Sequence, residues 1–321
     1  MVENPQTTYL VKEMVDEKVD PNTVLTEESI DSEVIVLKQK PITARIRTAI
    51  SHLQKRAGFR ARWRGLSLFV FYNVVFHWFN SSFAQLFIAT FMGEPQENSI
   101  EFLYAPALAS VLSSVLLARY AMAWTHVVIS EPSEKTWFRR LPGLKAWKKV
   151  VVPTAINAIA IQMCMFLPAV FFFALRLNDH EYMQSQEACS IATKLLAVFG
   201  IGLVTYIGLV IPSEVALVRV QASMLPEEHE SIVPFDRTFG GKVVPEILGG
   251  TGAIGWLDAW KTFDGAARLR LLKLFAQIAI VELFLHAFWA LIIGAEVLTI
   301  LGPALNPLIS SMHAQLTGNG L

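Results

Sequence analysis

Polar and ionisable side chains recur at helical spacing inside long apolar segments of this sequence. Asn73, His77 and Asn80 stand at positions i, i+4 and i+7, which places them on one face of a helix. Another such face, in the last apolar segment, carries Glu282, His286, Trp289 and Glu296. Ionisable groups are costly within a membrane and usually face the interior of a helix bundle. We therefore expect both faces to point toward protein rather than lipid.

Further polar residues lie at a similar depth. Arg119 and His126 are seven residues apart on one face, and Glu214 follows a proline whose missing N–H frees a backbone carbonyl. The depth of each residue in the membrane can be estimated at about 1.5 Å per residue from the basic end of its segment, and this estimate places five side chains in the cytosolic half of the membrane. These are Asn73, His77, Arg119, Glu214 and Glu282. We expect one polar cluster, in which Arg119 pairs with Glu214 or Glu282 and so lowers the cost of burying the charges.

These residue types suit acid–base chemistry or the binding of a polar group. The candidate catalytic residues are Glu214 and Glu282 as acid or base, with His77 and His286 as proton partners. The candidate substrate-binding residues are Asn73, Arg119, His126 and Trp289, with Arg119 holding an anionic group. Two alternatives stay open, because such side chains also bond one membrane helix to another or form a path for ions or protons. Asn157 and Gln162 face different ways and are predicted to be structural.

The elements that carry these residues are predicted to be membrane-spanning helices. Hydrophobic residues make up 53% of the 321-residue chain and charged residues 17%, whereas a soluble domain has nearer to a quarter charged residues. Five apolar runs are long enough to span hydrocarbon, and backbone groups in lipid must be hydrogen-bonded within a helix. The runs are 66–92, 102–129, 150–175, 191–220 and 271–301. The predicted fold is an all-α integral membrane domain over residues 65–301, followed by a short tail, 302–321.

Lysine and arginine are distributed unevenly between the connecting segments. Segments 41–64, 130–149 and 221–270 carry seven, six and five of these residues, whereas 93–101 carries none and 176–190 carries one. Connections on the cytosolic side are enriched in lysine and arginine. The sequence therefore predicts five crossings, with the N-terminus cytosolic and the C-terminus lumenal or external.

The segments outside the spans differ in charge and apolar content. Residues 1–40 hold nine acidic residues and four lysines with little apolar surface, which predicts a disordered acidic arm. Residues 41–64 place basic and apolar residues at helical spacing, which indicates a basic amphipathic helix on the membrane surface. At the end of the cytosolic loop 221–270, Trp256 and Trp260 begin a helical pattern that predicts an interfacial helix running into the last span.

One segment matches the amino-acid pattern of a dinucleotide-binding motif but lacks the sequence context that the motif needs. Residues 250–255 read Gly-Thr-Gly-Ala-Ile-Gly, but the motif functions within a βαβ unit that has an acidic residue on its second strand. Here the chain enters the membrane at Leu271, so we expect a membrane-proximal loop and no cofactor. The two cysteines, Cys164 and Cys189, support neither a disulfide framework nor a metal site. A nucleic-acid partner is not expected, because the basic segment 130–149 adjoins a span at both ends.

One stretch resembles a segment of multi-pass membrane proteins of filamentous fungi. It runs from Pro212-Ser213-Glu214 through Leu-Pro-Glu-Glu at 225–228 to Pro-Phe-Asp-Arg-Thr-Phe-Gly-Gly at 234–241, which is 30 residues. The resemblance implies a fungal source and marks the 221–241 loop as a family feature. It implies no reaction and no catalytic residue.

These features favour a five-span endomembrane protein that binds or processes a lipophilic small molecule in a polar pocket of the cytosolic half of the membrane. Whether it is an enzyme stays open. The rival hypothesis is a non-catalytic scaffold that recruits a cytosolic protein partner through loop 221–270 or the acidic arm. A transporter is disfavoured, because five helices without an internal repeat rarely form a path. We expect the endoplasmic reticulum or another endomembrane, with a mitochondrial membrane as the alternative.

Overall fold

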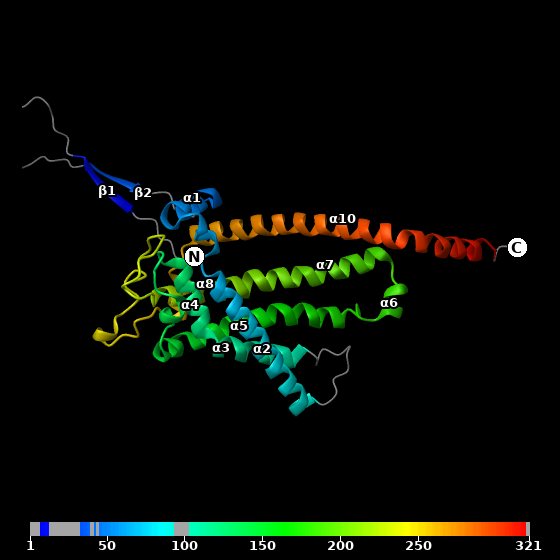
Figure 1. The fold of residues 1–321 in the computed structure, drawn as a ribbon, viewed down its shortest axis with the longest axis horizontal. Helices are drawn as coiled ribbons and strands as arrows, with labels where there is room; N and C mark the ends of the chain where they lie inside the picture. Colours follow the sequence, from blue (N-terminus) through cyan, green and yellow to red (C-terminus); the bar gives the residue numbers. More distant parts are fainter. Residues whose placement is uncertain (1–6, 13–32, 39–41, 43–44, 93–102, 319–321) are drawn as a thin grey trace, which may run out of the picture. The chain divides into compact units, whose positions relative to one another are not determined.

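The computed structural model describes residues 7–12, 33–38, 42, 45–92 and 103–318. Within these residues the chain is predominantly helical (Figure 1). It divides into two compact units, Met1–Phe263 and Asp264–Leu321. The described part of the second unit is one long helix, α10 (Gly265–Gly318), and the other helices belong to the first unit.

The described part of the N-terminal arm forms two antiparallel strands, β1 (Thr7–Lys12) and β2 (Glu33–Lys38). In this ladder Tyr9 lies opposite Val36. Both strands are rich in β-branched and aromatic residues, which favour strands over other structure. This pairing differs from the disordered arm that the acidic composition predicts. The rest of segment 1–40 lies outside the described residues.

A basic helix precedes the first apolar segment. The helix α1 (Ile46–Ala57) ends with two basic residues in its last turn, where cations interact favourably with the helix dipole. Gly58 follows with a φ of +71°, a conformation that residues with a Cβ rarely adopt. A 3₁₀ turn, Phe59–Trp63, then leads to the first apolar helix. These elements occupy most of segment 41–64, in which an amphipathic helix is expected.

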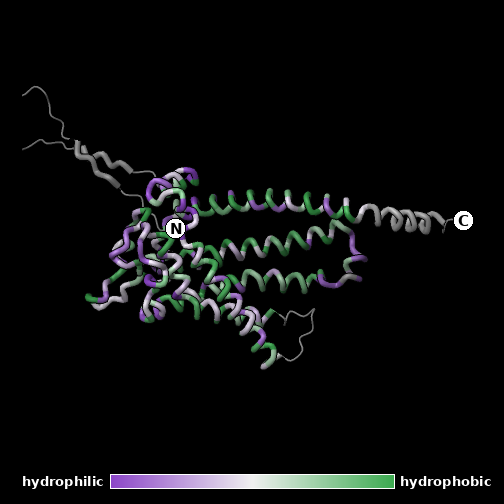
Figure 2. Tube along the Cα trace, in the orientation of Figure 1, coloured by the Kyte–Doolittle hydropathy of each residue, from purple (hydrophilic) through white to green (hydrophobic). Residues whose placement is uncertain are grey.

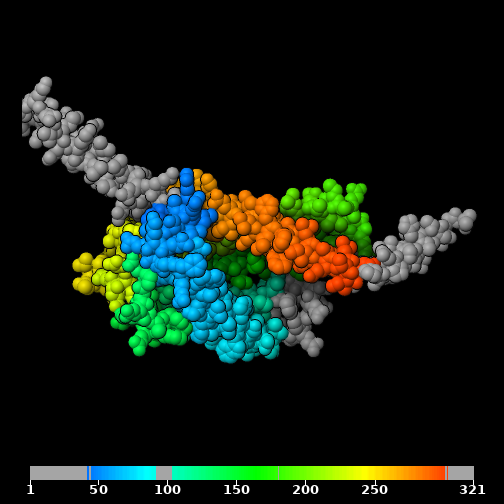
Figure 3. Space-filling view, turned by 45° about the horizontal axis from the view of Figure 1, so that its top comes forward, coloured from blue at the N-terminus to red at the C-terminus, as the bar shows by residue number. Residues whose placement is uncertain are grey.

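The first apolar segment is the helix α2 (Leu66–Phe87), which continues into a π turn at Ile88–Met92. One side of α2 exposes large apolar residues, among them Val70, Val74 and Trp78. In Figure 3, α1 (blue) and α2 (cyan) form one continuous stretch of the molecular surface. Polar residues interrupt the sequence of α2, and it is not among the helices that are apolar enough to count as spans.

Within the described residues, three helices are long and apolar enough to cross a membrane. They are α5 (Leu144–Ala174), the continuous helix Ala188–Ser223, and the Gly265–Ile300 part of α10. The pair α3 (Tyr104–Leu116) and α4 (Ala118–Ile129) makes a fourth span if the two helices cross together. Figure 2 shows hydrophobic residues along α5, α7 (Ala188–Thr205) and α10 and hydrophilic ones at the connection between α5 and α7. These helices indicate an integral membrane protein with three to four spanning helices.

One of the segments predicted as a single helix is bent sharply, and another contains a π turn. The helices α3 and α4 are bent by 60° at Leu117, so the uniform helix expected over 102–129 is wrong. The helices α7 (Ala188–Thr205) and α8 (Ile211–Ser223) are joined by a π turn, Tyr206–Val210. Proline lacks an N–H, and its ring clashes with the carbonyl four residues earlier. The wider π turn just before Pro212 accommodates both effects.

The connection between α5 and α7 contains one short helix, α6 (His180–Gln184). Asp179 caps it, because its carboxylate accepts a hydrogen bond from the backbone N–H of Tyr182 at 3.0 Å. Arg176 pairs with the same carboxylate. The hydrogen bond from Tyr182 and the guanidinium of Arg176 lower the pKa of Asp179. The turn between α5 and α7 is therefore held by local polar contacts.

The main buried cluster of the first unit lies where α8 meets the loop that follows it. Ala216, Val220 and Ala222 of α8 pack with Phe239, Ile254 and Ala259 from loop 221–270. Figure 1 shows this loop (yellow) beside the ends of α4 and α8. An antiparallel bridge between Ser130 and Ser231 also ties the loop to the end of α4. The loop is thus folded onto the helix ends.

The final part of the loop differs from the predicted helix. A six-residue helix, α9 (Trp256–Lys261), ends before Asp264, and α10 begins at Gly265. The interfacial helix expected to run without a break into the last span is therefore wrong. Arg219 lies between the rings of Phe239 and Phe263, with its Cζ 4.7 and 5.5 Å from the ring centroids. These cation–π contacts hold the turn after α9 against α8.

Candidate functional site

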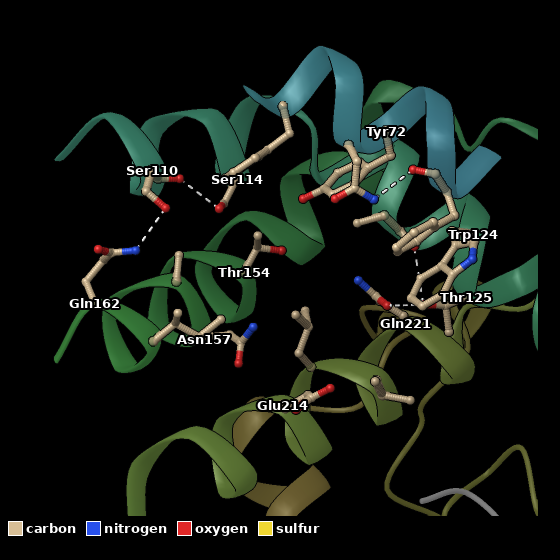
Figure 4. Close-up of a pocket in the computed structure, with 18 of the residues that line it drawn as sticks. Tyr72, Ser110, Ser114, Trp124, Thr125, Thr154, Asn157, Gln162, Glu214 and Gln221 are labelled. Carbon is tan, nitrogen blue, oxygen red and sulfur yellow. Dashed lines mark hydrogen bonds between the residues drawn. The ribbon is translucent and has the colours of Figure 1, made fainter. Parts of the chain in front are cut away.

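The first unit contains a cavity of about 440 Å³. Side chains from five helices line it: α2, α3, α4, α5 and α8. About half of the lining residues are apolar or aromatic and the rest carry polar groups. Ligand pockets of this size are common, and most combine an apolar wall with a few polar groups that fix orientation. Figure 4 shows polar side chains from several helices around one central space.

The wall formed by α2 is a single helical stripe. Phe69, Tyr72, Asn73, Phe76 and His77 follow the spacing i, i+3, i+4, i+7 and i+8, which brings them to one face. The side-chain nitrogen of Asn73 donates a hydrogen bond to the backbone carbonyl of Phe69 at 2.8 Å. The sequence therefore located Asn73 and His77 on the face that lines the cavity. It did not identify the three aromatic residues beside them.

The opposite wall comes from α5 and has the same helical spacing. Thr154, Asn157, Ala158, Ile161 and Gln162 line the cavity. Thr154 was not predicted as a site residue, and Asn157 and Gln162 were expected to face different ways. Residues that are three, four, seven or eight positions apart share a face, and the sequence shows that spacing from Thr154 to Gln162. These five residues therefore form one face of α5.

The amide side chains of α5 also connect the cavity walls. The Gln162 nitrogen donates to the Ser110 hydroxyl of α3 at 2.9 Å. The Asn157 oxygen accepts a hydrogen bond from the Ser213 hydroxyl of α8 at 3.0 Å. Each bond joins two helices across the edge of the cavity, so these amides have the structural role predicted for them and line the cavity as well.

Two polar groups at the cavity have no partner among the residues that the structure describes. Thr154 is 6% exposed, and its hydroxyl has no hydrogen-bond partner. Glu214 of α8 also lines the cavity. Within the described part of the chain, its carboxylate has neither an ion pair nor a hydrogen bond. An unpaired buried polar group costs free energy, and an isolated charge costs more. Both groups are therefore suited to a bound molecule.

The helices α4 and α8 are fastened together beside the cavity. The Thr125 hydroxyl donates to the side-chain oxygen of Gln221 at 2.6 Å, and the Nε2 atom of His126 lies 2.8 Å from the Gln221 backbone oxygen. His126 is 3% exposed and does not line the cavity. The structure thus places His126 at a contact between helices, whereas Thr125 and Gln221 form part of the cavity wall.

Arg119 is not part of the cavity. Its Nε atom donates to the backbone carbonyl of Pro142 at 2.9 Å. Among the described residues of the first unit it forms no ion pair with Glu214. The predicted pairing of Arg119 with Glu214 is therefore not found, and its pairing with Glu282 of the second unit stays a prediction. The bend at Leu117 separates Arg119 from the straight path on which its depth was counted, and a neutral carbonyl accepts its hydrogen bond instead.

The remaining predicted residues belong to α10, the second unit. Glu282, His286 and Trp289 are exposed within this unit. The Nδ1 atom of His286 lies 2.7 Å from the backbone oxygen of Glu282, one turn earlier. Trp289 contacts the ring of Phe288. Because α10 is one helix, these residues can share one face as expected. Their catalytic and substrate-binding roles stay predictions.

Basic side chains gather at the ends of the helices, outside the spans. Arg64 donates to the backbone carbonyl of Val127 at 3.0 Å, and Arg140 donates to the Ser130 hydroxyl at 2.5 Å. Burial lowers the pKa of Arg64, and the nearby charge of Arg140 lowers it further. These guanidiniums hold the connection after α4 in place, and neither residue lines the cavity.

The glycine-rich stretch 250–255 has a structural role in this fold. The 3₁₀ turn Glu246–Leu248 precedes it and the short helix α9 follows it, so no βαβ unit surrounds it. A Cβ on Gly250 would lie 2.2 Å from the carbonyl oxygen of Val244. The close approach of these two backbone segments explains the glycine. In the described residues no group of three or more His, Cys, Asp and Glu side chains could hold a metal ion.

Comparison of the chain with protein-family models, with curated proteins and with solved structures gives no match. The cavity is therefore the feature of the fold that bears on function. Its aromatic wall suits an apolar body, and its unpartnered polar groups suit a polar end on the same molecule.

Proposed function

We propose that this chain is a five-span membrane protein that binds a lipophilic small molecule with a polar end in the cavity between α2, α3, α4, α5 and α8. The observation that carries the proposal is a pair of polar groups at the cavity that lack a partner among the described residues, the buried Thr154 hydroxyl and the half-buried Glu214 carboxylate. A polar group that is buried without a partner lowers stability unless a ligand or water satisfies it. The aromatic residues of α2 supply an apolar surface beside them.

The topology follows from the distribution of basic residues and from the two sides of α2. Two of the polar residues that reduce the apolarity of α2, Asn73 and His77, line the cavity, whereas Val74 and Trp78 on another side are 64% exposed. A helix with its polar side toward a cavity and an apolar side toward lipid can cross a membrane. Counting α2 and the bent pair with the three apolar helices gives five spans. The lysine and arginine bias favours a cytosolic N-terminus and a lumenal or external C-terminus.

The chemistry at the cavity extends to acid–base catalysis. Glu214 and His77 both line the cavity, so a bound molecule would meet a carboxyl group and an imidazole from two different helices. Such a pair can move a proton to or from a ligand. Binding is the function that we propose, and turnover of the bound molecule would be a second step at the same site. Following the sequence analysis, we propose an endomembrane location and a fungal source.

A scaffold is the second candidate, and one observation favours it. In loop 221–270 Ile247 is 96% exposed and Leu248 is 75% exposed, beside a pair between Lys149 and Glu246. Exposed apolar residues at the tip of a loop suit contact with a protein partner or with the membrane surface. The scaffold does not explain the unpartnered groups at the cavity.

A variant that fills the cavity tests the proposal. Ser114 of α3 lines the cavity, and Ser114→Phe adds a ring to that space. Leu112 is on the same helix, is 48% exposed and does not line the cavity, so Leu112→Phe is the matched control. Native mass spectrometry of the proteins in lipid nanodiscs measures what each retains.

The wild type and Leu112→Phe should retain a lipophilic molecule in a one-to-one complex, and Ser114→Phe should lose it. Thermal unfolding of both variants shows whether the fold is kept. Equal retention by the wild type and a folded Ser114→Phe would show that the cavity is not the binding site.

A further inference from the structure

The charges that line the cavity have one sign. Glu214 contributes a carboxyl group, and no lysine or arginine is among the lining residues. His77 and Tyr72 are the other titratable residues of the lining, and both come from α2. A negatively charged ligand would lie near the Glu214 carboxylate without a lysine or arginine to offset the repulsion. The lining therefore disfavours a carboxylate, phosphate or sulfate group.

The Glu214 carboxylate has no partner of its own. Within the described residues it forms no ion pair, although four other pairs are present in the same unit. Removing a charge from water is costly unless an opposite charge or hydrogen-bond donors compensate. Figure 4 shows Glu214 on α8 and Thr154 and Asn157 on α5 around the same space. A cation bound there would supply the missing partner.

The Thr154 hydroxyl provides a second polar contact. It is buried, unpartnered and part of the same lining. A hydroxyl oxygen can accept a hydrogen bond from an N–H group of a ligand, while its proton can turn toward a ligand hydroxyl. An ammonium group has three N–H donors, so it can contact Glu214 and Thr154 together.

Aromatic rings complete the lining in a way that also suits a cation. Phe69, Tyr72, Phe76 and Trp124 all line the cavity. The rings of Phe69 and Trp124 have centroids 5.8 Å apart, and those of Tyr72 and Phe76 are 5.9 Å apart. The faces of such rings attract ammonium groups, and tryptophan does so most strongly. The same rings bury the hydrocarbon next to the charge.

We propose that the molecule bound in the cavity is a long-chain amine, with Glu214 as the counter-ion of its ammonium group and Thr154 as a hydrogen-bond partner. This inference rests on the proposed function, because it names the class of molecule that the cavity binds. It assigns Glu214 a binding role as a charge partner.

A pair of probes that differ in one charge tests the inference. Sphingosine carries an ammonium group near neutral pH, whereas N-acetylsphingosine has the same chain and hydroxyls but no charge. Binding of each probe is measured in nanodiscs of phosphatidylcholine, whose headgroup has no net charge. The proteins are the wild type, Glu214→Gln, Thr154→Val and Ser114→Phe. Glu227→Gln is a control that removes an exposed carboxylate outside the cavity.

The wild type and Glu227→Gln should bind sphingosine at least about tenfold more tightly than N-acetylsphingosine, which is about 1.4 kcal/mol. Glu214→Gln should remove this preference, and Thr154→Val should weaken sphingosine binding severalfold. Equal binding of both probes by the wild type would overturn the inference. A preference that persists in Glu214→Gln would overturn the role of Glu214.

The outcomes separate the two proposals. If both probes bind equally and Ser114→Phe abolishes both, the cavity binds lipophilic molecules but does not select an amine. If Ser114→Phe is folded and binds both probes like the wild type, the proposed function fails too. Should Glu214→Gln not fold, the comparison of the two probes on the wild type still decides whether an amine is preferred.

Discussion

Replacing Gly65 by alanine tests the contact between the start of α2 and the cavity wall. Gly65 precedes α2 with a φ of +75°, in the left-handed region. A Cβ at this position would lie 3.0 Å from Cδ1 of Trp124 and 3.4 Å from Cγ2 of Val128. Trp124 lines the cavity, so the backbone at Gly65 sets how closely α2 approaches this ring. Alanine should push the ring away.

The expected loss of stability has two parts. The left-handed conformation costs alanine roughly 1–2 kcal/mol, and overpacking against Trp124 adds roughly 1–3 kcal/mol. Gly249 is a matched control, because its φ and ψ of 79° and 8° resemble the 75° and 1° of Gly65. No atom lies within 4 Å of a Cβ built on Gly249. Gly249→Ala should therefore cost only the first part, and the difference between the two variants isolates the contact.

Thermal unfolding in detergent micelles, followed by circular dichroism, measures this difference. Gly65→Ala should unfold at a clearly lower temperature than Gly249→Ala, and its binding of the cavity ligand should weaken because Trp124 has moved. Equal unfolding temperatures for the two variants would refute the close packing of Gly65 on Trp124. The position of α2 at the cavity would then need revision.

Three further predictions concern topology, Arg119 and the loop after α8. An impermeant thiol reagent should label Cys189 only from the lumenal or external side and Ser133→Cys only from the cytosol; labelling of both from one side contradicts the five-span topology. Arg119→Met should lower the free energy of unfolding by about 1–3 kcal/mol, because one hydrogen bond to a carbonyl is lost. Adding Glu214→Gln should not recover this loss in a denaturation assay. Recovery would indicate that Arg119 and Glu214 form an ion pair after all. A hydrogen bond from Thr238 lowers the pKa of Asp236. The Asp236 carboxylate therefore stabilises the loop fully above its unfolded pKa of about 4, and this stabilisation is lost as the pH falls through the lowered pKa. Hydrogen exchange of the loop should accelerate over that pH range in the wild type, whereas in Asp236→Asn it should not change with pH after correction for the intrinsic rate.

Periodicity alone located part of the cavity. The polar stripe of α2 was visible because amide and imidazole groups stand out in an apolar segment. Thr154 did not stand out, since a lone threonine is common in apolar helices and only its burial without a partner distinguishes it. The same limit applied to the aromatic lining, because aromatic residues occur on every side of α2.

Depth along a straight helix could not predict the position of Arg119. The 60° bend between α3 and α4 redirects the chain, and no proline or glycine at Leu117 signals it. The π turn before Pro212 is different, because the proline itself indicated an irregularity in that helix. Local chemistry in the sequence thus predicted one interruption, whereas the other depends on packing between helices.

The contacts of loop 221–270 also could not be predicted from the sequence. Arg219 counts as a basic residue inside an apolar run, but in the fold it lies between the rings of Phe239 and Phe263. Those rings are 20 and 44 residues further along the chain. Spacing within one helix gives no information about such partners, so the burial of this charge became understandable only from the tertiary structure.

Photo-crosslinking with a long-chain amine that carries a diazirine beside its head group tests the central claim most directly. Mass spectrometry of the labelled peptides identifies the residues in contact with the probe. Binding in the cavity predicts labels on lining positions of α2, α5 and α8, such as Tyr72, Thr154 and Leu217, and their loss in Ser114→Phe but not in Leu112→Phe. Labels confined to exposed apolar positions such as Val74, unchanged by Ser114→Phe, would contradict the claim that the cavity binds a lipophilic molecule.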